Sequence, residues 1–197
     1  MMVPACDDRP DPVSNAHHMK TTRTDSAIYL VTGPMAAGKS TVARLLAERF
    51  DRGVYLEGDF FRQSIVTGRE EMTPDAPAEA IEQLRLRYRL AATVADIFCG
   101  AGFTVALEDV VAGPLLSEYV ELIRSRPLHV VVLLPSVEVL RSREAARPHK
   151  GYTHWEIEQL RGGFIADTPR IGLWLDTSEQ TAEQTVAEVL ALSRPYR

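Results

Sequence analysis

The stretch Ala27-Ile-Tyr-Leu-Val-Thr-Gly33-Pro-Met-Ala-Ala-Gly38-Lys39-Ser40-Thr41 decides the fold of this chain. Its second half, 33–41, fits the pattern G-x-x-x-x-G-K-S/T, which binds phosphate where it joins a strand to a helix. The run before it, 27–32, is apolar and rich in β-branched residues, and apolar residues recur at helical spacing over 42–50. An ordinary glycine-rich turn is the alternative, but this context predicts a phosphate-binding loop and a nucleoside triphosphate site.

Each residue type in this loop has a physical role. Gly33 and Gly38 let the backbone turn its N–H groups inward around a polyphosphate, and the helix that follows directs its positive N-terminal end at the same charge. Lys39 is expected to reach the β and γ phosphates, and the Ser40 hydroxyl to hold Mg²⁺. The residues predicted to bind the nucleotide are those of the whole loop: Gly33, Pro34, Met35, Ala36, Ala37, Gly38, Lys39, Ser40 and Thr41.

The composition is that of an ordinary soluble globular protein. Of the 197 residues, 45% are hydrophobic and 25% are charged, which suits one domain with a sizeable core. The formal net charge of −5 argues against a broad surface for nucleic acid, and no apolar run has the length of a membrane span. Cys6 and Cys99 are too few for a disulfide framework, and Cys99 is expected as a buried free thiol. We therefore expect a cytoplasmic protein with no nucleic-acid or membrane partner.

The chain divides into a leader and one folded domain. Residues 1–25 are rich in Pro and Asp and poor in apolar residues, which predicts a disordered leader. His17-His18 is interpreted as part of the composition of this leader rather than as a metal site. From residue 26 to 197, strand-like and helix-like segments alternate, as in parallel strands joined by helical crossovers. The expected strands lie near 27–32, 53–57, 103–108, 128–134 and 172–176. The expected helices lie near 39–50, 60–67, 78–99, 114–125, 136–147, 154–164 and 180–193.

The residues just after the second expected strand are the first candidates for catalysis. Ligands of such sheets bind beyond the carboxyl ends of the strands, so Asp59 is expected on the same rim as the phosphate loop. A carboxylate there is able to accept the proton of a substrate hydroxyl, which makes Asp59 the predicted general base. The alternative role for Asp59 is the N-cap of the next helix. Arg62 is a candidate for substrate binding, with an exposed helix arginine as its alternative.

The third expected strand ends in two acids, Glu108 and Asp109. A carboxylate at this position resembles the second acidic motif of nucleotide-dependent phosphotransferases, which orients Mg²⁺ or its water. Successive strand residues point to opposite faces, so only one of the two acids is expected in the cleft if the strand continues. The sequence leaves open which one faces the metal. The working assignment places Asp109 with Ser40 at the metal and Glu108 at the substrate.

A second basic segment is predicted to act as a lid over about 141–155. Arg143 and Arg147 lie four residues apart on one helical face, so two guanidinium groups are placed to close over a triphosphate and neutralise its charge. Pro148 and Gly151 end the helix and favour a mobile flap that excludes water. The alternative is a solvated basic helix end that complements the helix dipole.

Several of these motifs together resemble the P-loop small-molecule kinases. Within them the chain is most similar to the chloramphenicol phosphotransferase-like group and to the zeta-toxin sugar-nucleotide kinases. The resemblance covers about residues 27–195. The segments that carry it are Gly33 to Thr41, Leu56-Glu-Gly-Asp59, Val105 to Asp109, Arg143-Glu-Ala-Ala-Arg147 and Leu175-Asp-Thr-Ser178.

The resemblance implies a fold, a set of roles and a reaction. The fold is a P-loop NTPase of three layers, α/β/α, around a five-stranded parallel sheet of nucleoside-kinase type, with the two acidic-motif strands flanking the phosphate strand. Matching positions assign Asp59 as the base, Lys39 and Ser40 to ATP and Mg²⁺, and Arg143 and Arg147 to the lid. The reaction is ATP-dependent transfer of the γ-phosphate to a hydroxyl of a small molecule, an antibiotic in chloramphenicol phosphotransferase itself.

The acceptor is not named by the sequence. The segment 65–89 is expected to form much of the acceptor pocket, but no side-chain signature identifies the molecule bound there. A sugar-nucleotide or metabolite kinase shares every residue above and is the main alternative. A non-catalytic nucleotide switch is a third reading, against which the lack of a guanine-selecting Asn-Lys-x-Asp tetrad argues. A homodimer stays open, because relatives of this group commonly pair.

Overall fold

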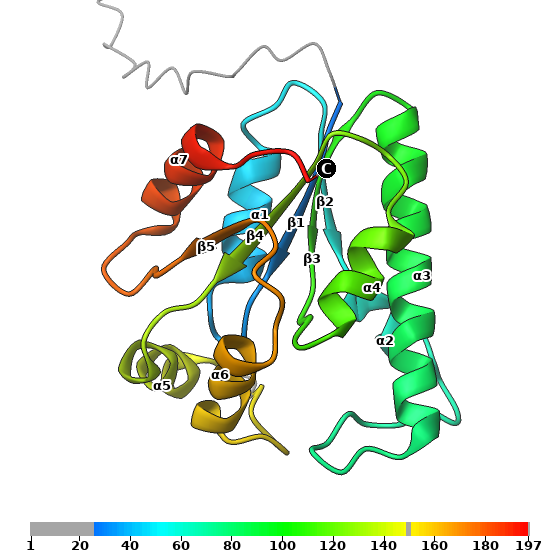
Figure 1. The fold of residues 1–197 in the computed structure, drawn as a ribbon, viewed down its shortest axis with the longest axis vertical. Coiled ribbons are helices and arrows are strands. Elements are labelled where there is room, and N and C mark those ends of the chain that lie inside the picture. The colour runs from blue at the N-terminus through cyan, green and yellow to red at the C-terminus, as the bar shows by residue number, and fades with distance from the viewer. Residues whose placement is uncertain (1–25, 149–150, 197) are drawn as a thin grey trace, which may run out of the picture.

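A five-stranded parallel sheet forms the centre of the computed structural model, which describes residues 26–148 and 151–196 (Figure 1). All four strand pairings are parallel, and each predicted strand is confirmed. The predicted leader, with Cys6 and His17-His18, lies outside the described residues. The strands are β1 (Ile28–Thr32), β2 (Gly53–Glu57), β3 (Thr104–Glu108), β4 (Leu128–Leu133) and β5 (Leu173–Leu175).

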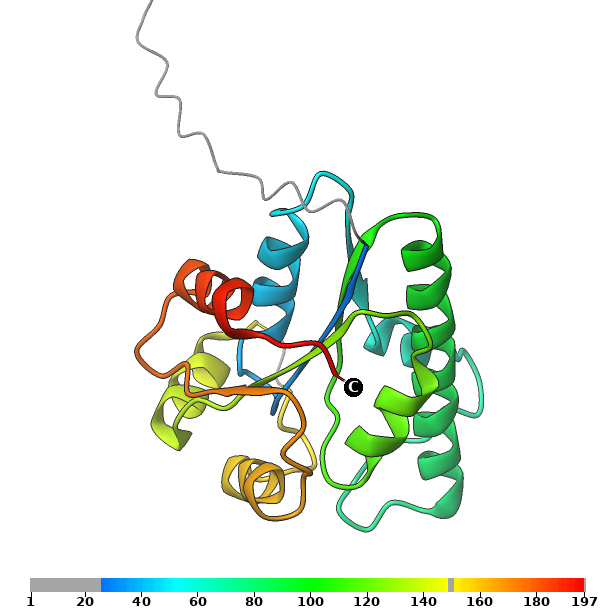
Figure 2. The same ribbon diagram turned by 45° about the horizontal axis from the view of Figure 1, so that its top comes forward.

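Helices cover both faces of the sheet, which confirms the three-layer α/β/α architecture (Figures 1 and 2). In both views α3 and α4 lie on one side and α1 and α7 on the other. Among the described residues, no helix combines the length and apolar character needed to cross a membrane. The helices are α1 (Lys39–Ala47), α2 (Asp59–Gln63), α3 (Ala78–Gly100), α4 (Leu115–Leu122), α5 (Val137–Ala146), α6 (Ile157–Ala166) and α7 (Ala182–Leu192).

The central strand β1 shows why this stretch is decisive for the fold. All five of its residues are buried, and they alternate between two cores. Ile28 and Leu30 pack into the core beneath α3 and α4, whereas Tyr29 and Val31 pack into the core beneath α1 and α7. A strand that is buried on both faces is typically a nearly continuous apolar run, as 27–31 is. Cys99, on α3, is a buried free thiol, as expected.

The predicted arrangement of the acidic-motif strands is wrong in one respect. Strand β1 is flanked by β3 and β4, and β2 lies at the edge of the sheet beyond β3. The burial of β2 fits this place, because none of its residues is fully buried whereas every residue of β1, β3 and β4 is. The end of β2 still reaches the rim: the Gly58 amide donates to the Glu108 carbonyl at 2.9 Å.

Candidate functional site

The phosphate loop adopts the backbone shape that its glycines permit. Gly33 has φ 146° and Gly38, at the N-terminus of α1, has φ 93°, which are conformations that favour glycine. A Cβ on Gly33 would lie 2.2 Å from the Leu133 carbonyl oxygen, so the loop packs against the end of β4 without room for a side chain. Ala36 also has a positive φ, 62°. The loop therefore forms with Met35, Ala36 and Ala37 between its two glycines.

Lys39 folds back over this loop. Its Nζ donates to the Pro34 carbonyl at 3.0 Å, and the residue is 7% exposed. Burial lowers the pKa of Lys39, while the nearby charges of Glu108 and Asp109 act in the opposite direction. The ammonium group thus lies inside the turn of the loop, where a negative ligand would gain a strong charge-assisted interaction.

Glu108 stands beside Ser40. The Ser40 hydroxyl donates to Glu108 Oε1 at 2.9 Å, and the Tyr55 hydroxyl donates to the same oxygen at 3.4 Å. A hydroxyl and a carboxylate are oxygen ligands of the kind that Mg²⁺ prefers. The residues present therefore fit a magnesium ion between the loop and the end of β3.

Asp109 is bonded to α3 rather than to the phosphate loop. Its Oδ1 accepts from Arg87 Nη2 at 2.5 Å and from the Val110 amide at 2.7 Å. Glu108 and Asp109 both line the main cavity, whereas only one of them was expected there if the strand continued past Glu108. The strand ends at Glu108, and the strict alternation of faces ends with it. The geometry favours Glu108 at the metal, against the working assignment of Asp109 there and of Glu108 at the substrate.

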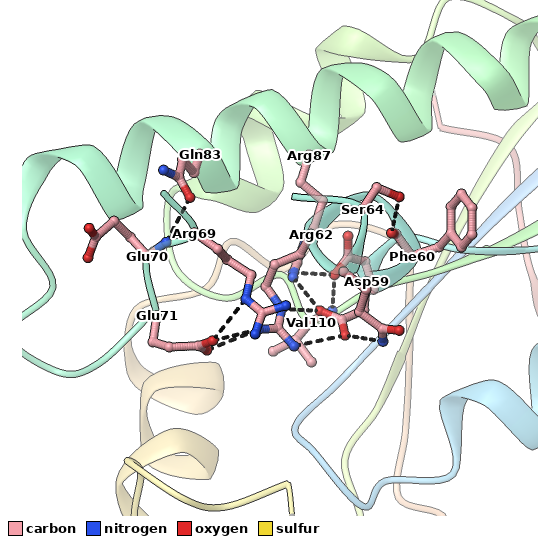
Figure 3. A network of polar contacts seen from close by, with 12 residues as sticks. Asp59, Phe60, Arg62, Ser64, Arg69, Glu70, Glu71, Gln83, Arg87 and Val110 are labelled. Atoms are coloured by element: carbon pink, nitrogen blue, oxygen red, sulfur yellow. Dashed lines mark hydrogen bonds and ion pairs between the residues drawn. The ribbon is translucent and has the colours of Figure 1, made fainter. Parts of the chain in front are cut away.

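Asp59 is the first residue of α2, where four hydrogen bonds hold its carboxylate (Figure 3). Oδ1 accepts from Arg62 Nε at 2.7 Å and from Arg87 Nη1 at 3.0 Å, and Oδ2 accepts from Arg62 Nη2 at 3.1 Å and Gln63 Nε2 at 2.9 Å. Burial raises the pKa of Asp59, but these hydrogen bonds and the two guanidinium charges more than offset it and hold the pKa below its usual value. The alternative N-cap role is wrong, because Gly58 occupies that position and no side chain caps the helix.

Arg62 links Asp59 to the loop before α3. Its Nη1 donates to both carboxylate oxygens of Glu71, at 2.9 and 3.0 Å, while Nε and Nη2 bond Asp59 (Figure 3). Arg62 lines the cavity, as a substrate-binding residue should, yet its guanidinium is already shared by two carboxylates. Its predicted role at the substrate stays a prediction.

Arg87 was not predicted from the sequence. This residue lies on α3, and its Nη1 and Nη2 bond Asp59 and Asp109 respectively. Its side chain is 11% exposed. One signal was present: Leu84, Tyr88 and Ala91 mark the buried face of α3, and Arg87 borders it. An arginine next to the apolar face of a long helix indicates a buried carboxylate partner, but the spacing does not say which.

The two predicted lid arginines both line the cavity but are held differently. Arg143, on α5, donates to the Ala37 carbonyl at 3.0 Å and to the Thr177 carbonyl at 3.2 Å, which fixes it against the phosphate loop. Arg147 follows the end of α5, and its side chain is 45% exposed, with a 3.4 Å contact to Glu144. Arg147 is therefore the freer of the two cations, and the lid itself stays a prediction.

The segment 151–155 connects the two sides of the cavity, a feature that the sequence analysis also missed. The Tyr152 hydroxyl donates to the Met35 carbonyl of the phosphate loop at 2.8 Å, and Trp155 Nε1 donates to the Met72 carbonyl at 2.9 Å. Glu144 accepts from the amides of Gly151 and Tyr152 at 2.6 and 3.2 Å. Residues 149–150 of the predicted lid lie outside the described residues.

All predicted site residues except Gly33, Pro34 and Ala37 line one cavity of about 940 Å³. One side consists of the phosphate loop with Lys39, Ser40 and the two lid arginines, and Asp59 lines the same space. The remaining wall comes from the end of β2, from α2, α3, α4 and α6, and from the connecting loops. It has an apolar part, formed by Ile65, Met72, Leu84, Val110, Leu115, Trp155 and Leu160, and a charged part that includes Glu57, Arg62, Glu70, Glu71 and Arg87. A second cavity of about 230 Å³ lies on the other side of Gly38, between Arg143, Thr177 and Gln180.

Comparison with known proteins agrees with this architecture. The family model described as "AAA domain" (AAA_33) matches residues 28–162. This chain belongs to the AAA-domain family. The match runs from β1 into α6 and so includes the phosphate loop, Asp59, Glu108 and both lid arginines. No curated relative matches this AAA-domain chain.

Solved structures show the same fold in two kinases and in a tunicamycin resistance protein. A sugar kinase from Janibacter sp. is 21% identical with a TM-score of 0.61, and the match covers 84% of this chain and 93% of that one. The tunicamycin resistance protein of Deinococcus radiodurans is 16% identical with a TM-score of 0.60, covering 87% and 99%. A shikimate kinase from Acinetobacter baumannii, in complex with shikimate, is 20% identical with a TM-score of 0.54, covering 85% and 92%. This AAA-domain chain thus has the fold of the P-loop kinases, while the narrower resemblance to the chloramphenicol phosphotransferase-like group stays a prediction.

Proposed function

We propose that this protein is an ATP-dependent phosphotransferase that moves the γ-phosphate of ATP to a hydroxyl of a small molecule. One observation carries the proposal: a hydrogen-bonded carboxylate, Asp59, lines the same cavity as the phosphate loop with Lys39 and Ser40. A nucleotide switch needs the phosphate loop but has no need of an acid facing it, so the shared cavity favours transfer over switching.

The phosphate loop and its neighbours would bind the nucleotide. The amides of 33–38 and Lys39 suit the β and γ phosphates, and Arg143 and Arg147 suit the charge that spreads over the transferring group. The small cavity beside Thr177 suits the base, because it opens from the same loop at Gly38. Ser40 and Glu108 would hold Mg²⁺, which neutralises phosphate charge when bound. Within the described ranges no group of three or more His, Cys, Asp or Glu suits a metal ion, so its other ligands would come from phosphate and water.

Asp59 would orient and deprotonate the acceptor. As the acceptor oxygen forms its bond to the γ-phosphorus, the bond from that phosphorus to the bridging oxygen of ADP breaks, and the acceptor proton passes to Asp59. Because its pKa is held low, Asp59 is ionised at neutral pH and accepts the hydrogen bond of the acceptor hydroxyl before the proton is transferred. In such reactions the chain contributes mainly positioning and charge neutralisation.

The acceptor side of the cavity supports an uncharged acceptor with an apolar body. The two arginines that line this side, Arg62 and Arg87, each hold two carboxylates. An anionic acceptor would have to displace Asp59, Glu71 or Asp109 from one of them. The apolar wall offers a surface for an aromatic or aliphatic alcohol instead.

A broad acceptor screen tests the proposed function. The full chain is incubated with γ-labelled ATP, Mg²⁺ and panels of antibiotics, nucleosides, sugars and sugar nucleotides, and labelled products are separated from ATP and phosphate. We expect label on an alcohol of one panel, and an uncharged alcohol in preference to its carboxylated analogue. Tight ATP binding with no labelled product from any panel would instead support the nucleotide switch.

A further inference from the structure

The buried arginine of α3 has a place in the site that the proposed function does not yet use. Arg87 Nη1 lies 3.0 Å from Asp59 Oδ1 (Figure 3), and Arg87 Nη2 lies 2.5 Å from Asp109 Oδ1. Asp59 follows the end of β2 and Asp109 follows the end of β3. One guanidinium therefore bonds the residues that follow two neighbouring strands, at the wall of the cavity.

We propose that Arg87 is a positioning residue for phosphoryl transfer, which fixes the carboxylate of Asp59 in the orientation that the acceptor hydroxyl requires. The proposal rests on the proposed function, since it gives Arg87 a role only through Asp59. Arg87 itself would touch neither the nucleotide nor the reacting atoms.

The source of each hydrogen bond to Asp59 supports this role. Arg62 and Gln63 belong to α2, the same five-residue helix as Asp59, so their bonds move with that helix. Arg87 comes from α3, a helix of 23 residues whose buried face packs into the core. It thus provides the direct side-chain bond between Asp59 and the rigid body of the domain.

The chemistry of the side chain also matters. A guanidinium presents donors in a fixed plane and is able to bridge two carboxylates, as Arg87 does here. A lysine ammonium is a single point charge, and we expect it to follow the more buried partner, Asp109, whose side chain is 2% exposed. A lysine at this position would then preserve the buried ion pair and release Asp59.

Other charged groups near Asp59 also influence its ionisation. Arg62 pairs with it directly, Glu71 shares Arg62, and the carboxylates of Glu57 and Asp109 lie close enough to influence the local charge. All of these remain in an Arg87→Lys variant. A change in the behaviour of Asp59 in that variant is therefore caused by the lost bridge.

The test compares Arg87→Lys with Arg85→Lys in the full chain. Arg85 lies two residues earlier on the same helix and also pairs with two carboxylates, Glu82 and Glu118, but its side chain is 40% exposed and does not line the cavity. With the acceptor that the screen identifies, we expect kcat of Arg87→Lys to fall at least tenfold while KM for ATP stays within about twofold. Arg85→Lys should retain both constants.

Two results would overturn the proposal. An unchanged kcat in Arg87→Lys would show that the bridge is structural only, and a raised KM for the acceptor at unchanged kcat would show that Arg87 binds the acceptor. The Asp59→Asn variant distinguishes failure of the Arg87 proposal from failure of the proposed function. If Asp59→Asn still transfers phosphate, the assignment of Asp59 as the base fails. If Asp59→Asn is inactive and Arg87→Lys is fully active, only the role of Arg87 fails.

Two further measurements keep the test decisive if the lysine variant is unstable or no acceptor is found. The double variant Arg87→Met/Asp109→Asn removes both charges of the buried ion pair, so no unpaired charge is left behind. Its kcat should fall at least tenfold, as in Arg87→Lys. In parallel, the ¹³C-detected titration of the Asp59 carboxyl needs no acceptor. Its midpoint should move to higher pH in Arg87→Lys and stay fixed in Arg85→Lys; equal midpoints in the two variants would contradict the proposal.

Discussion

At the residue scale, the carboxylates of this site differ in what surrounds them. Asp59 is held ionised by two guanidinium groups and remains partly exposed to the cavity. Asp109 is buried behind it, and Glu108 lies beside the phosphate loop at Ser40. In the proposed function, Asp59 accepts a proton, Asp109 forms a structural ion pair and Glu108 binds the metal. Each of these carboxylates has at least one partner that lies 22 to 68 residues away in the sequence.

The burial of Asp109 predicts a pH dependence of stability. Burial raises the pKa of Asp109 to about 6, although the Arg87 charge opposes this, while the unfolded chain has its ordinary value of 3.8. Between about pH 4 and about pH 6 the folded chain thus binds more protons at this site, and the free energy of unfolding falls as pH rises, by up to about 1.4 kcal/mol per pH unit. Denaturant unfolding at several pH values should show a smaller fall in Asp109→Asn. The same slope in both proteins would contradict the assignment.

Gly33 predicts a second effect of a single residue. A methyl group there meets the Leu133 carbonyl, and the φ of 146° is unfavourable for alanine, so Gly33→Ala should destabilise the fold by about 2 kcal/mol or more and weaken ATP binding. Gly162→Ala is the control. Gly162 lies in α6 with open space at its Cβ, and alanine there should be neutral or stabilise by about 0.5–1 kcal/mol. Thermal melts and ATP titration compare the two, and an equal response would be inconsistent with the tight packing at Gly33.

At the element scale, the helix α5 and the segment 151–155 supply the side of the site that faces the phosphate loop. The helix α5 and the segment 151–155 carry Arg143, Tyr152 and Trp155, which contact the phosphate loop on one side and Met72 on the other. Loops of this kind are well suited to open and close over a ligand. Glu144 joins this segment to α5 through two backbone amides.

Glu144→Ala should therefore loosen the segment without unfolding the domain. The amides of Gly151 and Tyr152 lose their acceptor, and a hydrogen bond to a charged group contributes about 1.5–3 kcal/mol, so their hydrogen exchange should quicken by tenfold or more. Glu158→Ala is the matched control, because Glu158 is an exposed acid that pairs with Arg141. Unchanged exchange at 151 and 152 in Glu144→Ala would show that Glu144 does not hold this segment.

At the scale of the whole molecule, the features that depend on local sequence patterns could be predicted from the sequence. The alternation of strands and helices, the phosphate loop and the meeting of Asp59 with that loop follow from the apolar periodicity and from the rule that parallel strands end at one rim. Strand order and side-chain pairing depend on long-range packing. For that reason β2 was placed wrongly beside β1, and Arg87, Tyr152 and Trp155 were missed.

The central claim is that Asp59 activates an acceptor hydroxyl next to ATP on the phosphate loop, and the Asp59→Asn variant tests it most directly. Its rate of phosphate transfer and its affinity for ATP are measured beside wild type and the exposed control Asp75→Asn. We expect transfer by Asp59→Asn to fall by about a hundredfold or more, with ATP affinity unchanged and Asp75→Asn equal to wild type. Transfer by Asp59→Asn at the wild-type rate would contradict the claim.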